Sequence, residues 1–337
     1  MRRPSPPARH RPGAFVALIA ALALIAAACG DDGTSETTAA RDTAPATEAP
    51  PVTAAPPETI TEPPPEPSGL RLELDGLGPL ANGFFYEGWV IIDGAPVSTG
   101  GFNVDDAGNL IELDGAPVDG LFATDIDLSG ATAIVITIEP VGDTDPGPST
   151  TKYLAGAVVD GATVLSVTAE PALGDDFAGA TGRYILATPS DGDGTNELSG
   201  IWFLEPNPRR PGLDLPVLPA GWIYEGWAVI DGIPVTTGRF PAPDLPDDFS
   251  GFSGNEGFPP LPGEDFLVNA PEGLAFPIDL SGMIAVISIE PTPDDGPAPF
   301  ALKPLVGGIP ADATDHTVYE LANRSDGFPT GVATIEG

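Results

Sequence analysis

The sequence predicts an all-β protein built from two tandem β-sandwich domains of the Ig-like type. Three observations lead to this fold class. The chain contains 42 glycines and 42 prolines among 337 residues, its apolar residues fall in short runs between turns, and its second half repeats its first. A chain that is 42% hydrophobic is too apolar to be disordered throughout. Many short strands joined by Gly- and Pro-rich turns are typical of sandwiches.

Residues 1–28 resemble a bacterial lipoprotein signal peptide. A basic segment precedes the apolar run 14–28, which is shorter than the roughly 20 residues needed to cross a membrane. Small residues then lead to Cys29, although Ala26 stands where a lipobox usually has leucine. Cys29 is the one cysteine of the chain. We therefore expect Cys29 to be lipidated, to anchor the protein on the outer face of the bacterial cytoplasmic membrane, and to leave the domains without disulfides.

Residues 29–68 are expected to form a disordered tether rich in Pro and Thr. The segment shows no hydrophobic periodicity. Proline-rich chain favours polyproline II, which extends by about 3.1 Å per residue. Fully extended, such a tether would hold the domains roughly 100 Å from the membrane.

Four segments recur in the same order in the two halves of the chain. Each copy spans about 130 residues, a normal domain size. The sequence therefore predicts a first repeat at 69–205 and a second repeat at 206–337. The matched segments are 84–102 with 222–240, 126–140 with 278–291, 148–156 with 299–307, and 184–192 with 319–327.

The first recurring segment predicts a central strand followed by a hairpin. Trp89 and Tyr86 lie on opposite faces under the strand period of two, and both faces are otherwise apolar. Asp93-Gly94 follows directly, with Asp231-Gly232 in the second copy. Asp-Gly between apolar runs indicates a two-residue hairpin turn.

A second buried strand is expected at 131–139, and the long insert 241–265 of the second copy is expected to be a loop. Ile134, Ile136 and Ile138 share one face of that strand. The insert is rich in Pro, Gly and Phe, and a loop of this kind either packs on the sandwich or presents an apolar patch to a partner. We therefore predict a binding surface at Phe249, Phe252, Phe258 and Phe266.

One motif occurs in both copies: Tyr-x-x-Trp, an apolar stretch, Asp-Gly-x-Pro-Val-Ser/Thr-x-Gly-x-Phe, and later an apolar strand that ends in Glu-Pro. It resembles the extracytoplasmic domain of the anti-sigma-K factor RskA family. The resemblance implies a β scaffold with a sensory or regulatory role. Members of that family place a sigma-binding helical domain and a transmembrane helix before this domain, and the sequence shows neither pattern. The matching residues are Tyr86, Trp89, Asp93, Gly94, Pro96, Val97, Ser98, Gly100, Phe102, Glu139 and Pro140, and then Tyr224, Trp227, Asp231, Gly232, Pro234, Val235, Thr236, Gly238, Phe240, Glu290 and Pro291.

The charge of the chain excludes nucleic acid as a partner. The net charge is −36 overall. Residues 1–28 hold four of the 13 basic residues and no acidic one, so the rest carries 9 basic against 49 acidic residues, or −40. Phosphate binding needs a basic surface. A protein partner is instead expected to be basic or to bind through cations.

The sequence gives little support for catalysis. His316 is the one histidine beyond the signal peptide, and G-x-S-x-G, H-E-x-x-H and P-loop motifs are absent from the sequence. We interpret His316 as a surface residue. Glu87 and Glu225 share a strand face with a tryptophan, and we expect each to hydrogen-bond a neighbouring loop rather than to act as an acid. We therefore predict a protein that is not an enzyme.

One turn of the sequence is a weak candidate for ion binding. Asp191 and Asp193 lie in an oxygen-rich turn, but the spacing departs from calcium loops. We expect an ordinary turn there, with no metal and no cofactor.

The two lysines occupy matched positions, which predicts the repeated pairs Glu139 with Lys152 and Glu290 with Lys303.

Three functions stay open from the sequence. The preferred one is a non-enzymatic extracytoplasmic lipoprotein with a sensory, regulatory or protein-binding role. Its partners would be the membrane, through lipid on Cys29, and an unidentified extracellular protein or ligand. The second is a structural or adhesive surface module. The third is a carbohydrate-active enzyme, which the scarcity of His, Cys and Lys disfavours.

Overall fold

The structure is a computed structural model that describes residues 68–81, 83–192, 194–293 and 296–337. The predicted signal peptide, Cys29 and the tether up to residue 67 lie outside the described residues. Within the described part the chain forms strands and one short 3₁₀ helix, η1 (Ser325–Gly327), so the all-β prediction is confirmed. None of the helices in this part has the length and apolar character that a membrane crossing requires.

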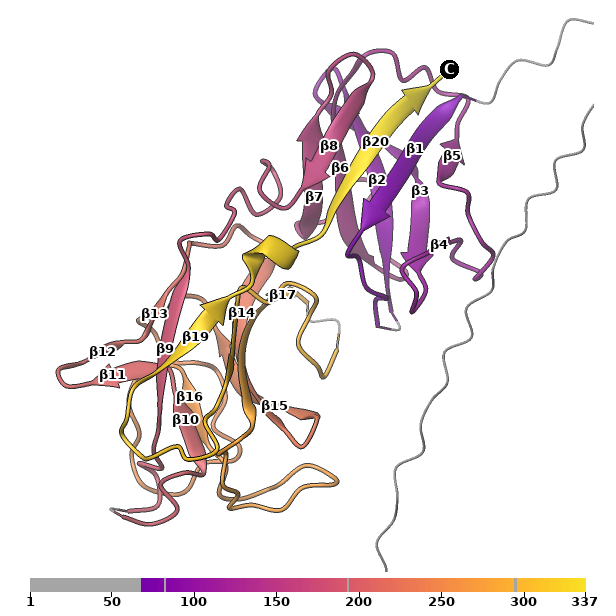
Figure 1. Cartoon of the computed structure of the whole chain (residues 1–337). Coiled ribbons are helices and arrows are strands. Elements are labelled where there is room, and N and C mark those ends of the chain that lie inside the picture. The colour runs from indigo at the N-terminus through magenta and orange to yellow at the C-terminus, as the bar shows by residue number, and fades with distance from the viewer. Residues whose placement is uncertain (1–67, 82, 193, 294–295) are drawn as a thin grey trace, which may run out of the picture. The chain divides into compact units, whose positions relative to one another are not determined.

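The first sheet contains nine antiparallel strands in the order β4-β3-β2-β6-β7-β8-β20-β1-β5 (Figure 1). Strand β2 lies between β3 and β6, as predicted for a strand with two apolar faces. The strands are β1 (Gly69–Asp75), β2 (Phe84–Ile92), β3 (Ala95–Val104), β4 (Leu110–Ile111), β5 (Leu121–Ala123), β6 (Ala131–Pro140), β7 (Lys152–Ala157), β8 (Ala162–Ser166) and β20 (Thr330–Glu336).

The second sheet follows the order β15-β14-β17-β18-β19-β9-β10-β16, and a ninth strand, β13, also pairs with β9. A separate hairpin joins β11 (Leu204–Pro206) to β12 (Arg209–Pro211). The strands of the second sheet are β9 (Thr181–Leu186), β10 (Gly200–Trp202), β13 (Leu213–Asp214), β14 (Trp222–Ile230), β15 (Ile233–Phe240), β16 (Gly263–Asp265), β17 (Ile284–Pro291), β18 (Leu305–Gly308) and β19 (Tyr319–Asn323).

The predicted hairpins form at both Asp-Gly pairs. Asp93 and Gly94 have φ angles of 51° and 78°, and Asp231 and Gly232 have 51° and 85°. Positive φ at both central residues is the signature of the type I′ turn, whose twist matches that of the flanking strands. The turns thereby fix the register of β2 with β3 and of β14 with β15.

Strands at opposite ends of each sheet approach each other around buried apolar side chains. In the first sheet, Phe102 of β3 and Phe122 of β5 approach to 5.3 Å between ring centroids, although these strands stand far apart in the strand order. In the second sheet β15 similarly approaches β16. Large side chains of both interiors are fully buried, among them Tyr86, Phe102, Tyr184, Tyr224 and Phe240.

The division of strands between the sheets does not coincide with the division of the sequence at residue 205. Strands β9 and β10 precede that point but belong to the second sheet. Strand β20 ends the second repeat but lies in the first sheet, between β8 and β1 (Figure 1, yellow beside indigo). Each repeat therefore contributes strands from its C-terminal part to the sheet of the other, β9 and β10 from the first repeat and β20 from the second.

The fourth pair of recurring segments, 184–192 and 319–327, was expected to form equivalent strands of two domains, and the structure arranges it differently. Tyr184 of β9 and Tyr319 of β19 are directly opposite each other in one sheet, with ring centroids 5.7 Å apart. Because the strands are antiparallel, the segments 184–192 and 319–327 meet only at these first residues and then run in opposite directions. β9 and β19 are thus neighbouring strands of one sheet rather than equivalent strands of two separate domains. The true counterpart of β9 is β20, and both begin with Thr-Gly.

The cores of the two sheets are continuous. Tyr153 of β7 lies 5.8 Å from Trp222 and 5.4 Å from Phe300, measured between ring centroids. The connections that lead into β9 and β20 also touch, through Phe177 and Phe328 at 5.7 Å. Buried aromatic contacts of this kind stabilise the joined repeats as one body.

Candidate functional site

A pocket of about 200 Å³ opens on the outer face of the second sheet, and it is the best candidate for a ligand site. Residues at the end of β9 alternate between the two faces: Tyr184 and Leu186 enter the core, while Ile185 and Ala187, the residue that follows the strand, belong to a separate outer cluster. The pocket is lined by Ile185, Ala187, Pro189, Trp202, Leu204, Pro206, Arg209, Pro259 and His316.

Trp202 lines this pocket and is held rigidly. Its side chain is 1% exposed, and its Nε1 donates a hydrogen bond of 2.7 Å to Oδ1 of Asp265. Its ring also lies 5.7 Å from that of Phe258. A buried tryptophan with its N–H satisfied forms a preorganised surface for an apolar group.

Arg209 is the arginine that lines the pocket, and two other arginines outside the lining are paired. Arg183 and Arg210 both pair with Glu205, and the hydrogen bond from Arg210 is the main reason that the pKa of Glu205 is lowered. Arg209 is exposed, and it joins none of the ion pairs formed among the residues that the structure describes. The Arg209 guanidinium is therefore available to a carboxylate of a ligand.

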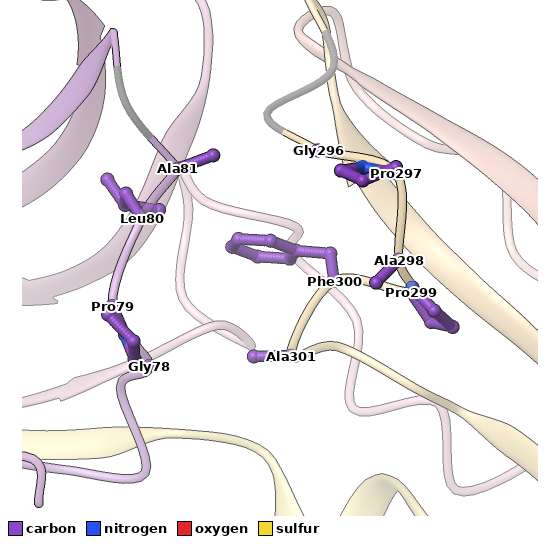
Figure 2. Close-up of a pocket in the computed structure, with 10 residues that line it drawn as sticks. All are labelled: Gly78, Pro79, Leu80, Ala81, Gly296, Pro297, Ala298, Pro299, Phe300 and Ala301. Atoms are coloured by element: carbon purple, nitrogen blue, oxygen red, sulfur yellow. The ribbon is translucent and has the colours of Figure 1, made fainter. Parts of the chain in front are cut away.

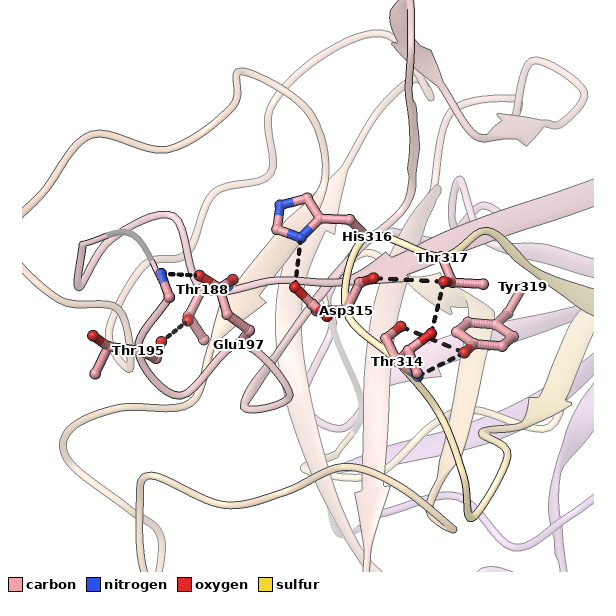
Figure 3. A network of polar contacts seen from close by, with 9 residues as sticks. Thr188, Thr195, Glu197, Thr314, Asp315, His316, Thr317 and Tyr319 are labelled. Carbon is pink, nitrogen blue, oxygen red and sulfur yellow. Dashed lines mark hydrogen bonds and ion pairs between the residues drawn. The ribbon is translucent and has the colours of Figure 1, made fainter.

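His316 borders the same pocket and meets two carboxylates (Figure 3). Its Nδ1 lies 3.2 Å from Oδ2 of Asp315, and potential ligand atoms of Glu197, Asp315 and His316 all lie within 4.8 Å of one another. Imidazole and carboxylate ligands suit zinc and related divalent ions.

The geometry around Glu197 is only partly suited to a metal. Its carboxylate already accepts hydrogen bonds from the backbone N–H groups of Gly194 at 2.7 Å and Thr188 at 3.3 Å. The side chains of His316 and Asp315 are 56% and 52% exposed. Water would compete with these exposed side chains for a cation, so they do not form a preformed metal site.

The weak ion-binding candidates of the sequence lie in the same loop. Oδ2 of Asp191 accepts a 2.7 Å hydrogen bond from the side chain of Asn196. Asp193 lies outside the described residues. Asp191 therefore takes part in the closure of its turn, as expected for an ordinary loop.

The four phenylalanines predicted as a binding surface mostly pack together. Phe249 contacts Phe252 at 4.9 Å, Phe252 contacts Phe266 at 6.0 Å, and Phe266 is fully buried. Phe258, which is 44% exposed beside Trp202, is the most accessible of the four. The insert thus covers the second sheet, and its accessible aromatic group lies near the pocket.

The predicted pairs of glutamate and lysine are not direct ion pairs within the described residues. Nζ of Lys152 donates a 2.9 Å hydrogen bond to the carbonyl of Ser149. Burial lowers the pKa of Lys303, and the charge of Glu290 opposes that shift.

Both glutamates are instead satisfied by matched local donors. Glu139 accepts from the Thr137 hydroxyl and from the N–H of Ser149 at 2.9 Å. Glu290 accepts from the Ser288 hydroxyl and from the N–H of Phe300 at 2.9 Å. Hydroxyl and amide donors can stabilise a buried carboxylate without a cation.

Glu87 and Glu225 bond the adjacent strand rather than a loop. Glu87 accepts from the Ser98 hydroxyl and Glu225 accepts from the Thr236 hydroxyl, the equivalent residue of the second copy. Burial raises the pKa of Glu87. The repeated contact identifies these glutamates as part of the strand scaffold.

Three further acids belong to the insert 241–265 itself. Burial raises the pKa of Glu264 to about 7 and that of Asp247 to about 6, and it also raises the pKa of Asp265. All three carboxylates accept hydrogen bonds from neighbouring groups of the protein, Asp247 from Gly263, Glu264 from Ser253 and Asp265 from Ser190 and Trp202. They are consequently placed to affect stability rather than to meet a substrate.

A second, larger groove of about 410 Å³ runs between residues 78–81 and 296–301 (Figure 2). Its lining consists of Gly, Pro, Ala, Leu and Phe residues. No charged side chain marks a preferred ligand there, so it ranks below the Trp202 pocket as a candidate site.

No protein-family model, curated protein or solved structure matches this chain. The candidate site therefore has to be interpreted from its own chemistry.

Proposed function

We propose that this protein is a non-enzymatic extracytoplasmic lipoprotein that binds a protein partner through the Trp202 pocket. The observation that carries the proposal is the combination of a rigid apolar wall at Trp202 with the Arg209 guanidinium at the rim. A volume of about 200 Å³ is below that of typical small-molecule sites. It suits a single apolar side chain presented by a partner.

The chemistry of the rim defines the partner more closely. Arg209 favours a carboxylate beside the inserted apolar side chain, because guanidinium and carboxylate form charge-assisted hydrogen bonds. The expected partner segment thus carries a residue such as leucine next to Asp or Glu. This differs from the basic partner that the net charge alone predicts, since local charge at the contact decides which group is accepted.

Binding of matched peptides tests this function. We expect the mature chain to bind short peptides with leucine beside aspartate at least about tenfold more tightly than peptides with leucine beside lysine. Arg209→Glu should abolish that preference, while Arg324→Glu, an exposed change of equal charge outside the pocket, should preserve it. Isothermal titration calorimetry gives the affinities. Equal binding of both peptides, or an unchanged preference in Arg209→Glu, would refute the proposal.

The sensory role rests on the resemblance of both repeats to the outer domain of the RskA family. A long tether gives the domains reach from the membrane. In this proposal the protein reports or captures its partner outside the cell and takes no direct part in sigma-factor binding.

Anchoring makes a separate prediction. Cys29→Ala should release the protein from the membrane fraction, because the lipid on Cys29 supplies the attachment. Detergent phase partitioning followed by immunoblotting measures this release. If the variant partitions with the detergent as the parent does, lipid on Cys29 is not the anchor.

A further inference from the structure

Strands β9 and β20 occupy equivalent slots with the same register. In the first sheet Gly331 pairs with Leu165 and Val332 pairs with Val164. In the second sheet Gly182 pairs with Leu321, and Arg183 pairs with Glu320. Leu165 and Leu321 are both buried in their cores. Positions 182 and 331 therefore correspond, as do 183 and 332, and 184 and 333.

This equivalence defines an alternative arrangement in which each repeat keeps its own strand. Strand β9 would follow β8 into the first sheet, and β20 would follow β19 into the second. Because the register is the same, either strand can form the antiparallel backbone pairing next to β8 or β19. The register next to β8 and β19 does not distinguish the two arrangements, so we compare the side chains that meet there.

The outward-facing side chains favour exchange. In the observed arrangement Nε of Arg183 lies 3.4 Å from a carboxylate oxygen of Glu320, and Val332 lies opposite Val164. Without exchange, Arg183 would face Val164 and Val332 would face Glu320. Matched cross-strand pairs are replaced by mismatched ones.

The inward-facing side chains favour exchange more strongly. Ala333 is fully buried opposite Thr163, whereas Tyr184 is fully buried against Tyr319. Without exchange the phenol ring of Tyr184 would have to enter the slot of Ala333. That slot would be overpacked, and the slot left by Tyr184 would contain a cavity.

The two crossing connections add contacts of their own. The side-chain amide of Asn323 donates hydrogen bonds to the carbonyls of Phe177 at 2.7 Å and Ala180 at 3.0 Å. Phe177 also contacts Phe328. The connection before β9 is thus fixed to the end of β19 and to the connection before β20.

We infer that the chain has two register-equivalent closed arrangements, and that the residue pairs 183/332 and 184/333 select the one in which the repeats exchange strands. Each repeat is then a strand-accepting site for the other. The two repeats consequently act as one obligate unit, and a ligand held by either sheet is held by both repeats.

Disulfide trapping tests the exchange in the full mature chain carrying Cys29→Ser. Val332→Cys with Val164→Cys should oxidise to an intramolecular disulfide, because directly opposed strand residues are within disulfide reach. Val332→Cys with Glu320→Cys should stay reduced in the monomer. Gel mobility with and without reductant, and mass spectrometry, distinguish the products. The reverse pattern would overturn the exchange.

A residue swap tests the selection. The fourfold variant Arg183→Val, Val332→Arg, Tyr184→Ala, Ala333→Tyr should favour the arrangement without exchange. We monitor it with Ala162→Cys and Thr334→Cys, which are opposed only after exchange. The yield of this disulfide should fall about tenfold. The matched control carries Arg183→Lys and Val332→Ile and should retain the parental yield.

Each outcome of the residue swap shows whether these four residues select the arrangement with exchanged strands. A folded fourfold variant with the parental disulfide yield would refute the role of these four residues. Should the fourfold variant fail to fold by circular dichroism, the pair Arg183→Val with Val332→Arg carries the same test. A reduced yield there supports selection, and an unchanged yield overturns it.

Discussion

Residues 68–205 and 206–337, expressed as separate chains, are expected to be poorly folded alone and to combine into a folded one-to-one complex. The first fragment lacks β20, so a slot opens between β8 and β1, and its own β9 fits that slot badly because Tyr184 replaces Ala333. The second fragment lacks β9 and β10 from its sheet. Each fragment must therefore rely on the other for a closed sheet.

The stability that each separate fragment loses can be estimated from the core that the two repeats share. Separation removes Trp222 and Phe300 from the ring of Tyr153. Loss of a buried aromatic side chain costs about 3–5 kcal/mol, and a domain is typically stable by about 5–15 kcal/mol. Overpacking at the slot of Ala333 costs about 1–3 kcal/mol more. Together these losses remove most of the stability of each fragment.

Light scattering after size-exclusion chromatography and circular dichroism measure the recombination. A second fragment that ends at residue 329 is the matched control, because without β20 it should not restore the first sheet. Two fragments that each unfold cooperatively and ignore one another would contradict the prediction.

The local elements of this fold are predictable from short stretches of sequence. The apolar alternation of 84–92 and 131–139 specifies β2 and β6, since each needs to bury one or both faces. The pairs Asp93-Gly94 and Asp231-Gly232 specify hairpins, since Asp and Gly tolerate positive φ. In these places the local preference and the tertiary structure agree.

The exchange of strands could not be predicted in the same way. β9 and β20 both begin with Thr-Gly, and either fits next to β8 or β19 in the same register. The choice depends on which side chain meets Ala333 or Glu320 across the sheet, and that information is not local. The similarity of segments 184–192 and 319–327 favoured a simple tandem, although the strands that contain them, β9 and β19, pair with each other in one sheet.

The candidate site depends on that same exchange. Glu197 and His316 are far apart in the sequence and meet because β9 pairs with β19. Trp202, which lines the pocket, was not among the site residues predicted from the sequence; its lack of a tryptophan counterpart in the other repeat is a signal that could have found it. The four phenylalanines suggested a binding surface, but an apolar loop can also bury its own side chains against the sheet, as Phe252 and Phe266 do.

The free energy of unfolding is expected to fall as the pH rises from about 5 to about 8, and Glu264 should account for a large share. Its carboxylate is fully buried next to the Ser253 hydroxyl and the N–H of Asp265, yet burial dominates and raises its pKa from 4.5 to about 7. Asp247, whose pKa is raised to about 6, lies close enough to oppose its ionisation. Neither acid has a cation partner among the ion pairs of the described residues.

The fall in the free energy of unfolding with rising pH follows from proton linkage. The folded state holds the proton of Glu264 more tightly than the unfolded state does, so the stabilisation is complete below about pH 4 and is lost as the pH rises through about 7. A shift from 4.5 to about 7 corresponds to about 3 kcal/mol at most. Nearly all of that loss falls between about pH 5 and about pH 8.

Glu264→Gln isolates this contribution, because glutamine has no proton to lose. Urea unfolding at about pH 5 and about pH 8 should show a difference in unfolding free energy smaller by about 2–3 kcal/mol in Glu264→Gln than in the parent. Comparing the two pH values within each variant removes any uniform cost of the substitution itself. Glu256→Gln, an exposed change in the same insert, should leave the parental difference intact. A parental pH difference that persists in Glu264→Gln would mean that this buried acid is already ionised in the folded protein at about pH 5, with its charge held by the hydroxyl and amide donors around it.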